Sequence, residues 1–576
     1  MAWFEENPDL LQRELHALEA AGLSCTVDES ARQDEHLLRL EVSGTIEGDT
    51  HTWMCAFPDA YPYFPPFVTG PDRGYRYHHH PDTGQYCLLR DGDGGWKPSM
   101  TLAQLLREQW PKFLAAQRAS SSSEATPALE VQQAEPWTQY LQYEDSRQSV
   151  LWDATLEPPE SESAGFIEGV PLGKYNGFKW LALVRSDLGG QHVAGRDLGE
   201  VAREIYAAGR EETIPWVRLA SAPGGTDPAA WWEEAARAWE VVRPAVMAGK
   251  KKSGGAVTQL LVTFPEEVGH RELGWGWVLV RAQRRGKPKT IPPTFQRVVR
   301  VGPDDLARRA PALAPIQDRR VLVAGLGGLG SQIVRLLAQT SPAELVLWDP
   351  DVVEADTAVR WAGALAMDGV PKAVALAHDV LDTQAHTRLE LLGARVGHTR
   401  GSMGQQANSV GDQHGDLVRR LPDLDLVVDA TANRSVQHYL SVQARDHGVA
   451  YMRADAQYGV WSGLVGLQRP GGEVCWMCWM HHVNDQTIPT LLSDPDGEIQ
   501  PPGCGAPTYV GTAFDLAPIA AESVRMATSY LTETGEADRH PFDVMTLRLR
   551  DHDGRLTVPT WEGHELERHP ACPNHG

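Results

Sequence analysis

The fold is decided by the stretch Arg320-Val-Leu-Val-Ala-Gly-Leu-Gly-Gly-Leu-Gly-Ser331. Its first residues form an apolar run rich in Val and Leu, which is typical of a parallel strand buried on both faces. The four glycines that follow are Gly325, Gly327, Gly328 and Gly330. They let the backbone turn sharply and come close to a phosphate, and the amphipathic segment 331–339 predicts the next helix. The sequence therefore predicts a nucleotide phosphate bound at a helix N-terminus.

A second apolar run, Leu345-Val-Leu-Trp-Asp349, ends in an acidic residue about 20 residues after the glycines. That spacing places Asp349 to bind a ribose hydroxyl, and Asp351 follows closely. An NAD-binding Rossmann domain would fit these features equally well. Three other features of the sequence argue against an NAD-binding domain. They are an upstream domain that bears a nucleophile, a lone cysteine in a Gly- and Pro-rich loop downstream, and paired motifs typical of a zinc site.

The bulk composition excludes several classes of protein. A chain of 576 residues is too long for one core, so three or four domains are expected. The net charge of −23 argues against a nucleic-acid surface, because phosphate binding relies on clustered Lys and Arg. We find neither a signal peptide nor an apolar run of about 18 residues, so no membrane partner is expected. The 7 cysteines do not form a disulfide framework, which favours a cytoplasmic protein.

The chain divides into four parts by pattern. Residues 1–118 predict an α+β unit, and the Ser-rich residues 119–135 a flexible linker. Residues 136–312 show strands and helices but no chemical motif, which indicates a central linker or docking domain of mixed fold and unknown role. In residues 313–576 strands and helices alternate as in a doubly wound α/β domain. The predicted fold class is therefore a multidomain α/β and α+β chain.

Five short motifs follow one another in the N-terminal unit: Tyr61-Pro62, Pro65-Pro66, His80-Pro81-Asp82, Cys87 and Trp96-Lys97-Pro98. Their order resembles the ubiquitin-conjugating (E2) family. The resemblance implies that Cys87 carries a thioester, and a Gly- and Asp-rich loop would expose it to an incoming amine. The usual asparagine of the family is Asp82 here, and an ionised aspartate cannot donate to an oxyanion. The oxyanion donor is left open between backbone N–H groups and the histidines at 78–80. A catalytically inactive binding module is the alternative.

The C-terminal part resembles the E1/ThiF/MoeB adenylation family through its glycine loop, Asp349, Asp351, Arg360 and Lys372. The resemblance implies that the glycine loop holds the phosphates of ATP and that Asp349 holds the ribose. Arg360 and Lys372 would neutralise the phosphates while a carboxylate attacks the α-phosphate and pyrophosphate leaves.

One motif departs from that family. Its fourth-strand motif usually ends in an aspartate that binds Mg²⁺, and this chain reads Asp429-Ala-Thr-Ala432-Asn433. Ala432 cannot coordinate a metal, so Asp429, or alternatively Asp455, would have to take that role. Impaired adenylation is the other outcome.

Two further cysteine patterns carry chemistry. Cys504 lies between glycines and prolines, unlike a packed core cysteine. It resembles the acceptor cysteine of an E1 enzyme. The alternative is an exposed cysteine without a role. Cys475-Trp-Met-Cys478 pairs with Cys572-Pro-Asn-His575 as four ligands suited to a structural zinc. His569 is a second candidate ligand, and a redox Cys-x-x-Cys is the competing interpretation.

The E2–linker–E1 order as a whole resembles the CD-NTase-associated fusion enzyme of CBASS anti-phage operons. That resemblance implies a homodimer that uses ATP, Mg²⁺ and Zn²⁺. It would join the C-terminus of a cGAS-like CD-NTase to a target lysine through Cys504 and Cys87, and a JAB-type peptidase would reverse the bond. The alternatives are the same chemistry on a true ubiquitin-like protein of another operon, sulfur-carrier activation, and a non-catalytic scaffold.

Overall fold

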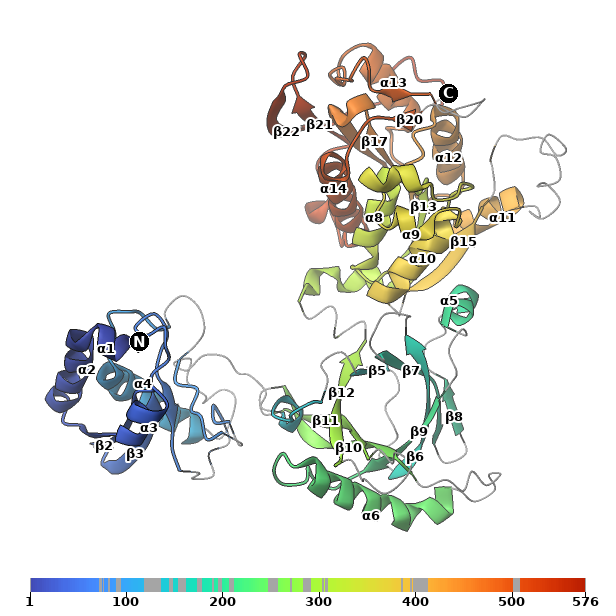
Figure 1. Cartoon of the computed structure of the whole chain (residues 1–576). Coiled ribbons are helices and arrows are strands. Elements are labelled where there is room, and N and C mark those ends of the chain that lie inside the picture. Colours follow the sequence, from blue (N-terminus) through green and yellow to red (C-terminus); the bar gives the residue numbers. More distant parts are fainter. Residues whose placement is uncertain are drawn as a thin grey trace.

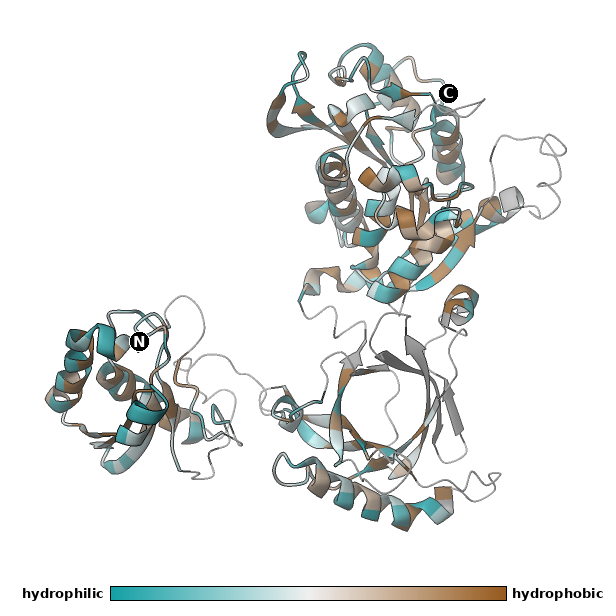
Figure 2. Cartoon of the chain, in the orientation of Figure 1, coloured by the Kyte–Doolittle hydropathy of each residue, from teal (hydrophilic) through white to brown (hydrophobic). Residues whose placement is uncertain are grey.

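The structure is a computed structural model that describes residues 2–71, 75, 77–80, 83–89, 95–118, 136–144, 149–153, 162–172, 179–188, 191–194, 199–206, 212–246, 257–269, 272–282, 292–302, 305, 309–384, 387–393, 396, 413–500 and 508–574. These residues form an N-terminal region, a central region and a C-terminal region (Figure 1). Hydrophobic residues gather where helices face the sheets (Figure 2). Among the described helices, none has the length and apolar character needed to cross a membrane.

The N-terminal region is a four-stranded antiparallel meander with helices packed on it. Its strands pair in chain order: β1 (Ser24–Val27), β2 (Arg39–Ile46), β3 (Asp49–Ala56) and β4 (Phe67–Thr69). Its helices are α1 (Trp3–Glu6), α2 (Pro8–Ala20), α3 (Glu29–Asp34) and α4 (Leu102–Arg118). Asn7 caps α2 with its side chain, and Pro8 occupies the first turn. The core between sheet and helices is aromatic: the ring centroids of Trp53 and Trp110 lie 5.2 Å apart.

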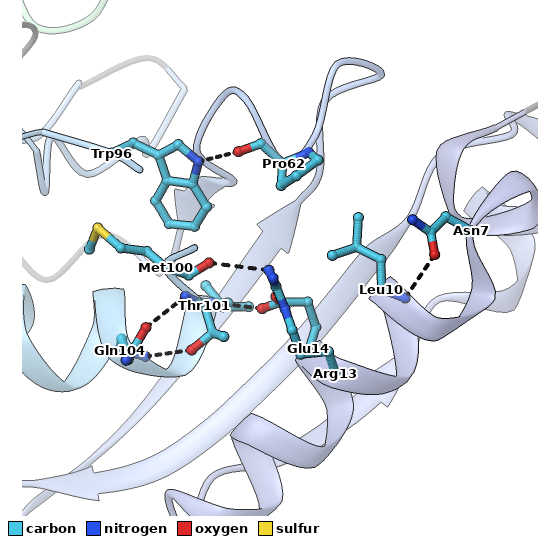
Figure 3. A network of polar contacts seen from close by, with 10 residues as sticks. Asn7, Leu10, Arg13, Glu14, Pro62, Trp96, Met100, Thr101 and Gln104 are labelled. Carbon is cyan, nitrogen blue, oxygen red and sulfur yellow. Dashed lines mark hydrogen bonds and ion pairs between the residues drawn. The ribbon is translucent and has the colours of Figure 1, made fainter. Parts of the chain in front are cut away.

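A buried carboxylate joins α2 to α4 (Figure 3). Glu14 is fully buried, and its Oε2 accepts the backbone N–H of Leu102 at 2.9 Å. Arg13 donates to the other oxygen, also at 2.9 Å. Thr101 and Gln104 cap the same helix reciprocally, through backbone N–H groups and side-chain oxygens. The negative charge of Glu14 therefore sits at the positive end of α4, where the helix dipole favours it.

The central region is a closed β-barrel, which the sequence did not predict. Its strands are β5 (Ser149–Asp153), β6 (Ala164–Leu172), β7 (Lys179–Leu188), β8 (Gln191–Ala194), β9 (Glu212–Arg218), β10 (Gln259–Gly269), β11 (Glu272–Arg281) and β12 (Thr294–Val301). They pair in the order β5-β12-β11-β10-β9-β6-β7-β8, and β7 also pairs with β5, which closes the ring.

Side chains alternate between the two faces of each barrel strand, so the region has two separate apolar clusters. Leu261 belongs to a cluster that draws side chains from strands around the ring, so this cluster fills the interior. Its neighbours Leu260 and Val262 belong to the cluster that includes Trp231 of α6 (Pro228–Val246). The other helices of the region are η2 (Trp137–Gln139) and α5 (Gly199–Tyr206). Ala202 of α5 is buried in the core of the C-terminal region, so the two regions share an apolar contact.

The C-terminal region is the doubly wound α/β domain that the sequence predicts. Its sheet has the order β15-β14-β13-β16-β17-β18-β21-β22, with β13 to β17 parallel and the remaining strands antiparallel. The strands are β13 (Arg320–Ala324), β14 (Glu344–Trp348), β15 (Arg388–Leu392), β16 (Leu426–Asp429), β17 (Ala450–Ala456), β18 (Ser462–Gln468), β21 (Val544–Arg550) and β22 (Leu556–His564). A separate hairpin pairs β19 (Glu498–Ile499) with β20 (Thr508–Tyr509).

Helices cover both faces of this sheet. They are η3 (Pro311–Asp318), α8 (Gly328–Ala338), η4 (Ala355–Val359), α9 (Ala364–Met367), α10 (Lys372–Thr383), α11 (Gln413–Arg420), η6 (Leu421–Asp423), α12 (Arg434–Asp446), η7 (Tyr458–Val460), α13 (Trp476–Asn484), α14 (Ala513–Leu531) and η8 (Glu536–Asp538). One apolar cluster packs α8, α10 and α14 on the sheet, and another packs α11, α12 and α13. Strands buried on both faces explain the unbroken Val and Leu runs of β13 and β14.

We predict that Glu14→Ala loosens α4 without unfolding the chain. The variant leaves the Leu102 N–H without its buried acceptor, which costs about 1–3 kcal/mol. Native-state hydrogen exchange of the α4 amides should become faster accordingly. Glu19→Ala is the matched control, because Glu19 is an exposed residue of the same helix. Equal exchange rates in both variants would contradict this account of the contact.

Candidate functional site

The candidate site lies where the strand order of the C-terminal sheet reverses. The chain leaves β13 for β14 on one side, and β16 pairs with β13 on the other. In open α/β sheets the crevice beyond the carboxyl ends of two such strands is the usual ligand position. The glycine loop, the loop after β14 and the loop after β16 all follow the carboxyl ends of these neighbouring parallel strands, so the predicted nucleotide residues come from one edge of the sheet.

The glycines of the loop have different structural roles. Gly325 has φ +80°, and a Cβ there would lie 2.7 Å from the backbone of Ala430 and Thr431. A Cβ on Gly330 would lie 1.8 Å from the carbonyl oxygen of Gly325. Gly327 differs, because a Cβ there would meet none of the described atoms within 4 Å. The loop is therefore packed tightly on its inner side and open at Gly327.

Asp349 holds the glycine loop from the adjacent strand. Its carboxylate accepts the N–H of Leu326 at 2.6 Å and the N–H of Asp351 at 2.8 Å. Lys372 Nζ lies 4.0 Å from Asp349 Oδ2 and 3.6 Å from Asp351 Oδ2. Burial raises the pKa of Asp349, and the charge of Lys372 acts in the opposite direction. The structure thus brings these three predicted residues together; the role of Asp349 as ribose ligand stays a prediction.

Arg360 bridges the glycine loop and a segment that the sequence did not single out. A Cβ on Gly328 would lie 3.1 Å from Arg360 Cδ, so the arginine side chain passes over this glycine. Its Nη2 donates to Thr508 Oγ1 at 2.6 Å, and its Nη1 donates to the carbonyl of Tyr509. The guanidinium also lies 4.8 Å from the centre of the Tyr509 ring. Thr508 and Tyr509 form β20, and they are the functional residues that sequence reasoning missed.

Asp429 is the most deeply buried of the candidate residues. It ends β16 with no exposed surface, and its Oδ1 accepts both the backbone N–H and the hydroxyl of Thr431, at 2.9 and 2.7 Å. Tyr451 donates to its Oδ2 at 3.1 Å. Burial raises the pKa of Asp429 to about 6. To bind Mg²⁺ this carboxylate would have to exchange hydrogen bonds for the metal, so that role stays a prediction.

The side-chain oxygen atoms of Asn433 and Asp455 already take part in hydrogen bonds and an ion pair, so these atoms are not free to coordinate a metal. Ala432 adopts φ 55°, and Asn433 uses its side chain to cap α12. Asp455, the alternative ligand, is buried and forms an ion pair with Arg453, whose Nε lies 2.6 Å from Asp455 Oδ2. Gln437 donates to the other oxygen of Asp455 at 2.9 Å. A magnesium ion would therefore have to rely largely on phosphate oxygens, as Mg²⁺ commonly does.

The cysteine predictions have different outcomes. Cys504 lies outside the described residues, and so does Asp82. Cys87 is exposed, and its backbone N–H donates to the carbonyl of His78 at 2.8 Å. Trp96 Nε1 donates to the carbonyl of Pro62 at 2.6 Å, which joins two of the predicted motifs (Figure 3).

Three cysteines of the predicted zinc site converge in the C-terminal region. Cys475 Sγ lies 3.8 Å from Cys478 Sγ and 3.6 Å from Cys572 Sγ, and all three residues are buried. Zinc–sulfur bonds of about 2.3 Å in a tetrahedron put two sulfurs about 3.8 Å apart, so the donor set fits zinc. His575 lies outside the described residues. His569 instead lies beside His482 and Asp485.

We predict a contrast between two glycine substitutions. Gly330→Ala forces a methyl group onto the Gly325 carbonyl, and such overpacking costs about 1–3 kcal/mol or more. Gly327→Ala places its methyl group in open space and should leave stability unchanged. Hydrogen exchange in β13 and α8 measures both. A stable Gly330→Ala domain would mean that the loop packs differently.

We also predict a pH dependence from Asp429. Its pKa of about 6 lies above the ordinary 3.8, so between these values the folded state binds the extra proton. The free energy of unfolding should therefore fall as pH rises from about 4 to about 6, by on the order of 3 kcal/mol, and level off above that. Asp429→Asn should lack this contribution when denaturant unfolding is followed in EDTA. Asp553→Asn, an exposed position, is the control; a wild-type-like slope in Asp429→Asn would refute the assignment.

Two relatives resemble the chain over nearly its whole length. Two Sinorhizobium fredii proteins, described as uncharacterized proteins y4oA and y4qC, are 28% and 29% identical to this chain. The alignments cover 99% and 97% of this chain and 97% and 95% of the relatives.

Among solved structures, Escherichia coli MccB with ATP matches with a TM-score of 0.33 and 15% identity, over 46% of this chain and 69% of that one. PaaA matches with a TM-score of 0.31 and 14% identity, over 44% and 66%. Residues 305–552 match the model of the ThiF family. This part of the chain is therefore a ThiF family domain, which supports E1-like, ATP-dependent adenylation of a carboxylate.

Proposed function

We propose that this chain activates the C-terminal carboxylate of a partner protein with ATP and passes it through two cysteine thioesters to a lysine. One observation carries the proposal: a ThiF family domain brings a glycine loop, Asp349, Lys372 and Arg360 together at the point where its strand order reverses. Gly327 is open and Arg360 passes over the neighbouring Gly328, which suits a polyphosphate, because backbone N–H groups and positive charge both favour anions there.

The first step is adenylation. A carboxylate oxygen of the partner attacks the α-phosphate of ATP, the bond to the β-phosphate breaks, and pyrophosphate leaves with Mg²⁺. Lys372 and Arg360 would neutralise the charge that develops on the phosphates. Asp349 would hold the ribose and fix the glycine loop through the Leu326 N–H. The Cys504 thiolate would then attack the acyl carbon and release AMP.

The second step is transfer to Cys87. In the N-terminal region the four-stranded meander lies between α2 and α4, and Cys87 lies between β4 and α4. Cys87 is exposed, as a cysteine must be if a thioester and then an amine are to reach it. A lysine amine would take the acyl group from Cys87 as an isopeptide. The two uncharacterized relatives align over nearly the whole chain, which supports a joint role for all three regions.

The partner is the least constrained part of the proposal. The E2–linker–E1 order favours a cGAS-like CD-NTase in an anti-phage operon, with a ubiquitin-like protein of another operon as the second candidate.

We further propose that Zn²⁺ binds Cys475, Cys478, Cys572 and His575 as a structural ion, because three buried sulfurs lie at tetrahedral spacing.

The relay can be tested on non-reducing gels with Mg-ATP and the nucleotidyltransferase encoded beside this chain. We expect DTT-sensitive adducts in wild type, and we expect Cys87→Ala to hold the partner on Cys504. Cys504→Ala should form no adduct but should still exchange pyrophosphate into ATP. Lys372→Ala should lower that exchange by about 10-fold or more, since it removes a phosphate contact of roughly 1.4 kcal/mol.

Cys25→Ala serves as the matched control, because Cys25 is a half-buried cysteine of the same region as Cys87. AMP formation only with a ubiquitin-like protein would transfer the proposal to that partner. Absence of both exchange and adduct with either partner would favour a non-catalytic scaffold. The loss of adenylation would then be assigned to Ala432, which replaces the aspartate that usually binds Mg²⁺.

A further inference from the structure

A second cluster of metal-binding side chains follows the cysteines along α13. Cys475, Cys478, His482 and Asp485 are spaced by three, four and three residues, so they share one face of the helix. The C-terminal segment repeats the pattern, since His569 precedes Cys572 by three residues. His482, Asp485 and His569 offer ligand atoms that all lie within 4.8 Å of one another.

His482 is oriented as a metal ligand is. Its Nε2 lies 2.8 Å from the backbone carbonyl of Glu567, which can only accept, so Nε2 carries the proton. The lone pair of the neutral ring is then on Nδ1. This atom is buried, and among the described residues it has no hydrogen-bond partner. The residue as a whole is 8% exposed. Metal-binding histidines commonly show this arrangement, with one nitrogen fixed on a backbone carbonyl and the other on the ion.

Asp485 brings a carboxylate oxygen to the same cluster of ligand atoms. Its Oδ1 accepts the backbone N–H and the hydroxyl of Thr487, at 3.0 and 2.7 Å. Its Oδ2 is left facing His569 Nε2 at 3.1 Å. His569 Nδ1 accepts the N–H of Ala571 at 3.1 Å. Two imidazole nitrogens and one carboxylate oxygen are therefore gathered at one point between α13 and the C-terminal segment.

We propose that these three side chains bind a divalent transition metal of the Zn²⁺ class. Its ligands are His482 Nδ1, Asp485 Oδ2 and His569 Nε2. Imidazole with a carboxylate suits Zn²⁺ or Co²⁺, and the exposed side of Asp485 leaves room for water as a further ligand. The site is separate from the cysteine cluster and does not depend on the proposed adenylation.

Metal binding has one local consequence. When the ion binds His569 Nε2, the proton on Nε2 leaves to solvent and Nδ1 takes up a proton from solvent. The neutral ring therefore keeps one proton, now on Nδ1, so the contact with the Ala571 N–H opens. This contact lies in an exposed turn, where opening costs little. The ion would fasten the segment 567–572 to α13 alongside the cysteines.

The test is the zinc content of full-length protein, purified without chelator and saturated with ZnSO₄, by plasma mass spectrometry. We expect two zinc ions per chain in wild type and one in both His482→Ala and Asp485→Asn. His447→Ala is the matched control and should keep two, because His447 follows the last residue of α12 and its Nδ1 lies beside the Gln443 carbonyl. Asp485→Asn changes an exposed residue, so loss of folding does not obscure the result.

Cobalt distinguishes the two sites directly. With Co²⁺, the thiolate site should give an intense charge-transfer absorbance, and Cys478→Ser should weaken it. The histidine site should give only weak visible bands, which His482→Ala should remove while the thiolate absorbance stays. Equal metal content in wild type, His482→Ala and Asp485→Asn overturns the proposal, whether or not the cysteines hold zinc. The three residues are then a hydrogen-bonded His–Asp pair.

Discussion

The close approach of the glycine loop to the loop after β16 determines the rest of the C-terminal region. A Cβ on Gly325 or Gly330 would lie within 2.7 or 1.8 Å of backbone atoms, so side chains are excluded at this contact. The contact lets α8 begin immediately beyond the carboxyl end of β13. Because β16 must sit beside β13 for this packing, the contact also fixes where the strand order reverses.

Buried charge is the second constraint on the site. Asp349, Asp429 and Asp455 are all nearly inaccessible, and burying a carboxylate is unfavourable unless it is paired or hydrogen-bonded. Each is compensated differently: Asp349 by backbone N–H groups and Lys372, Asp429 by hydroxyls and a backbone N–H, and Asp455 by Arg453. Asp429 has no cation beside it, and its burial leaves its pKa raised.

The sequence could predict what is local and periodic. The strand, glycine turn and helix from Arg320 onward, the cap at Asn7, and the convergence of Cys475 with Cys572 all follow from spacing. The closure of the barrel could not be predicted in this way, because the parallel pairing of β5 with β7 joins segments that are separate in the sequence. The same holds for the contact of Arg360 with Thr508, which spans 148 positions. The roles of Cys87 and Cys504 stay predictions.

The position of Arg360 shows how the nucleotide site and the hairpin of β19 and β20 depend on each other. A free arginine side chain has considerable rotamer entropy, and a ligand that immobilises it must offset that loss. Here Thr508 Oγ1, the Tyr509 carbonyl and the Tyr509 ring already hold the guanidinium beside the glycine loop. A phosphate that binds there meets an ordered cation, but it must also compete with two neutral acceptors. Because a charged phosphate is the stronger acceptor, the exchange favours the ligand. β20 would therefore be part of the proposed nucleotide site, although no motif in its sequence indicates it.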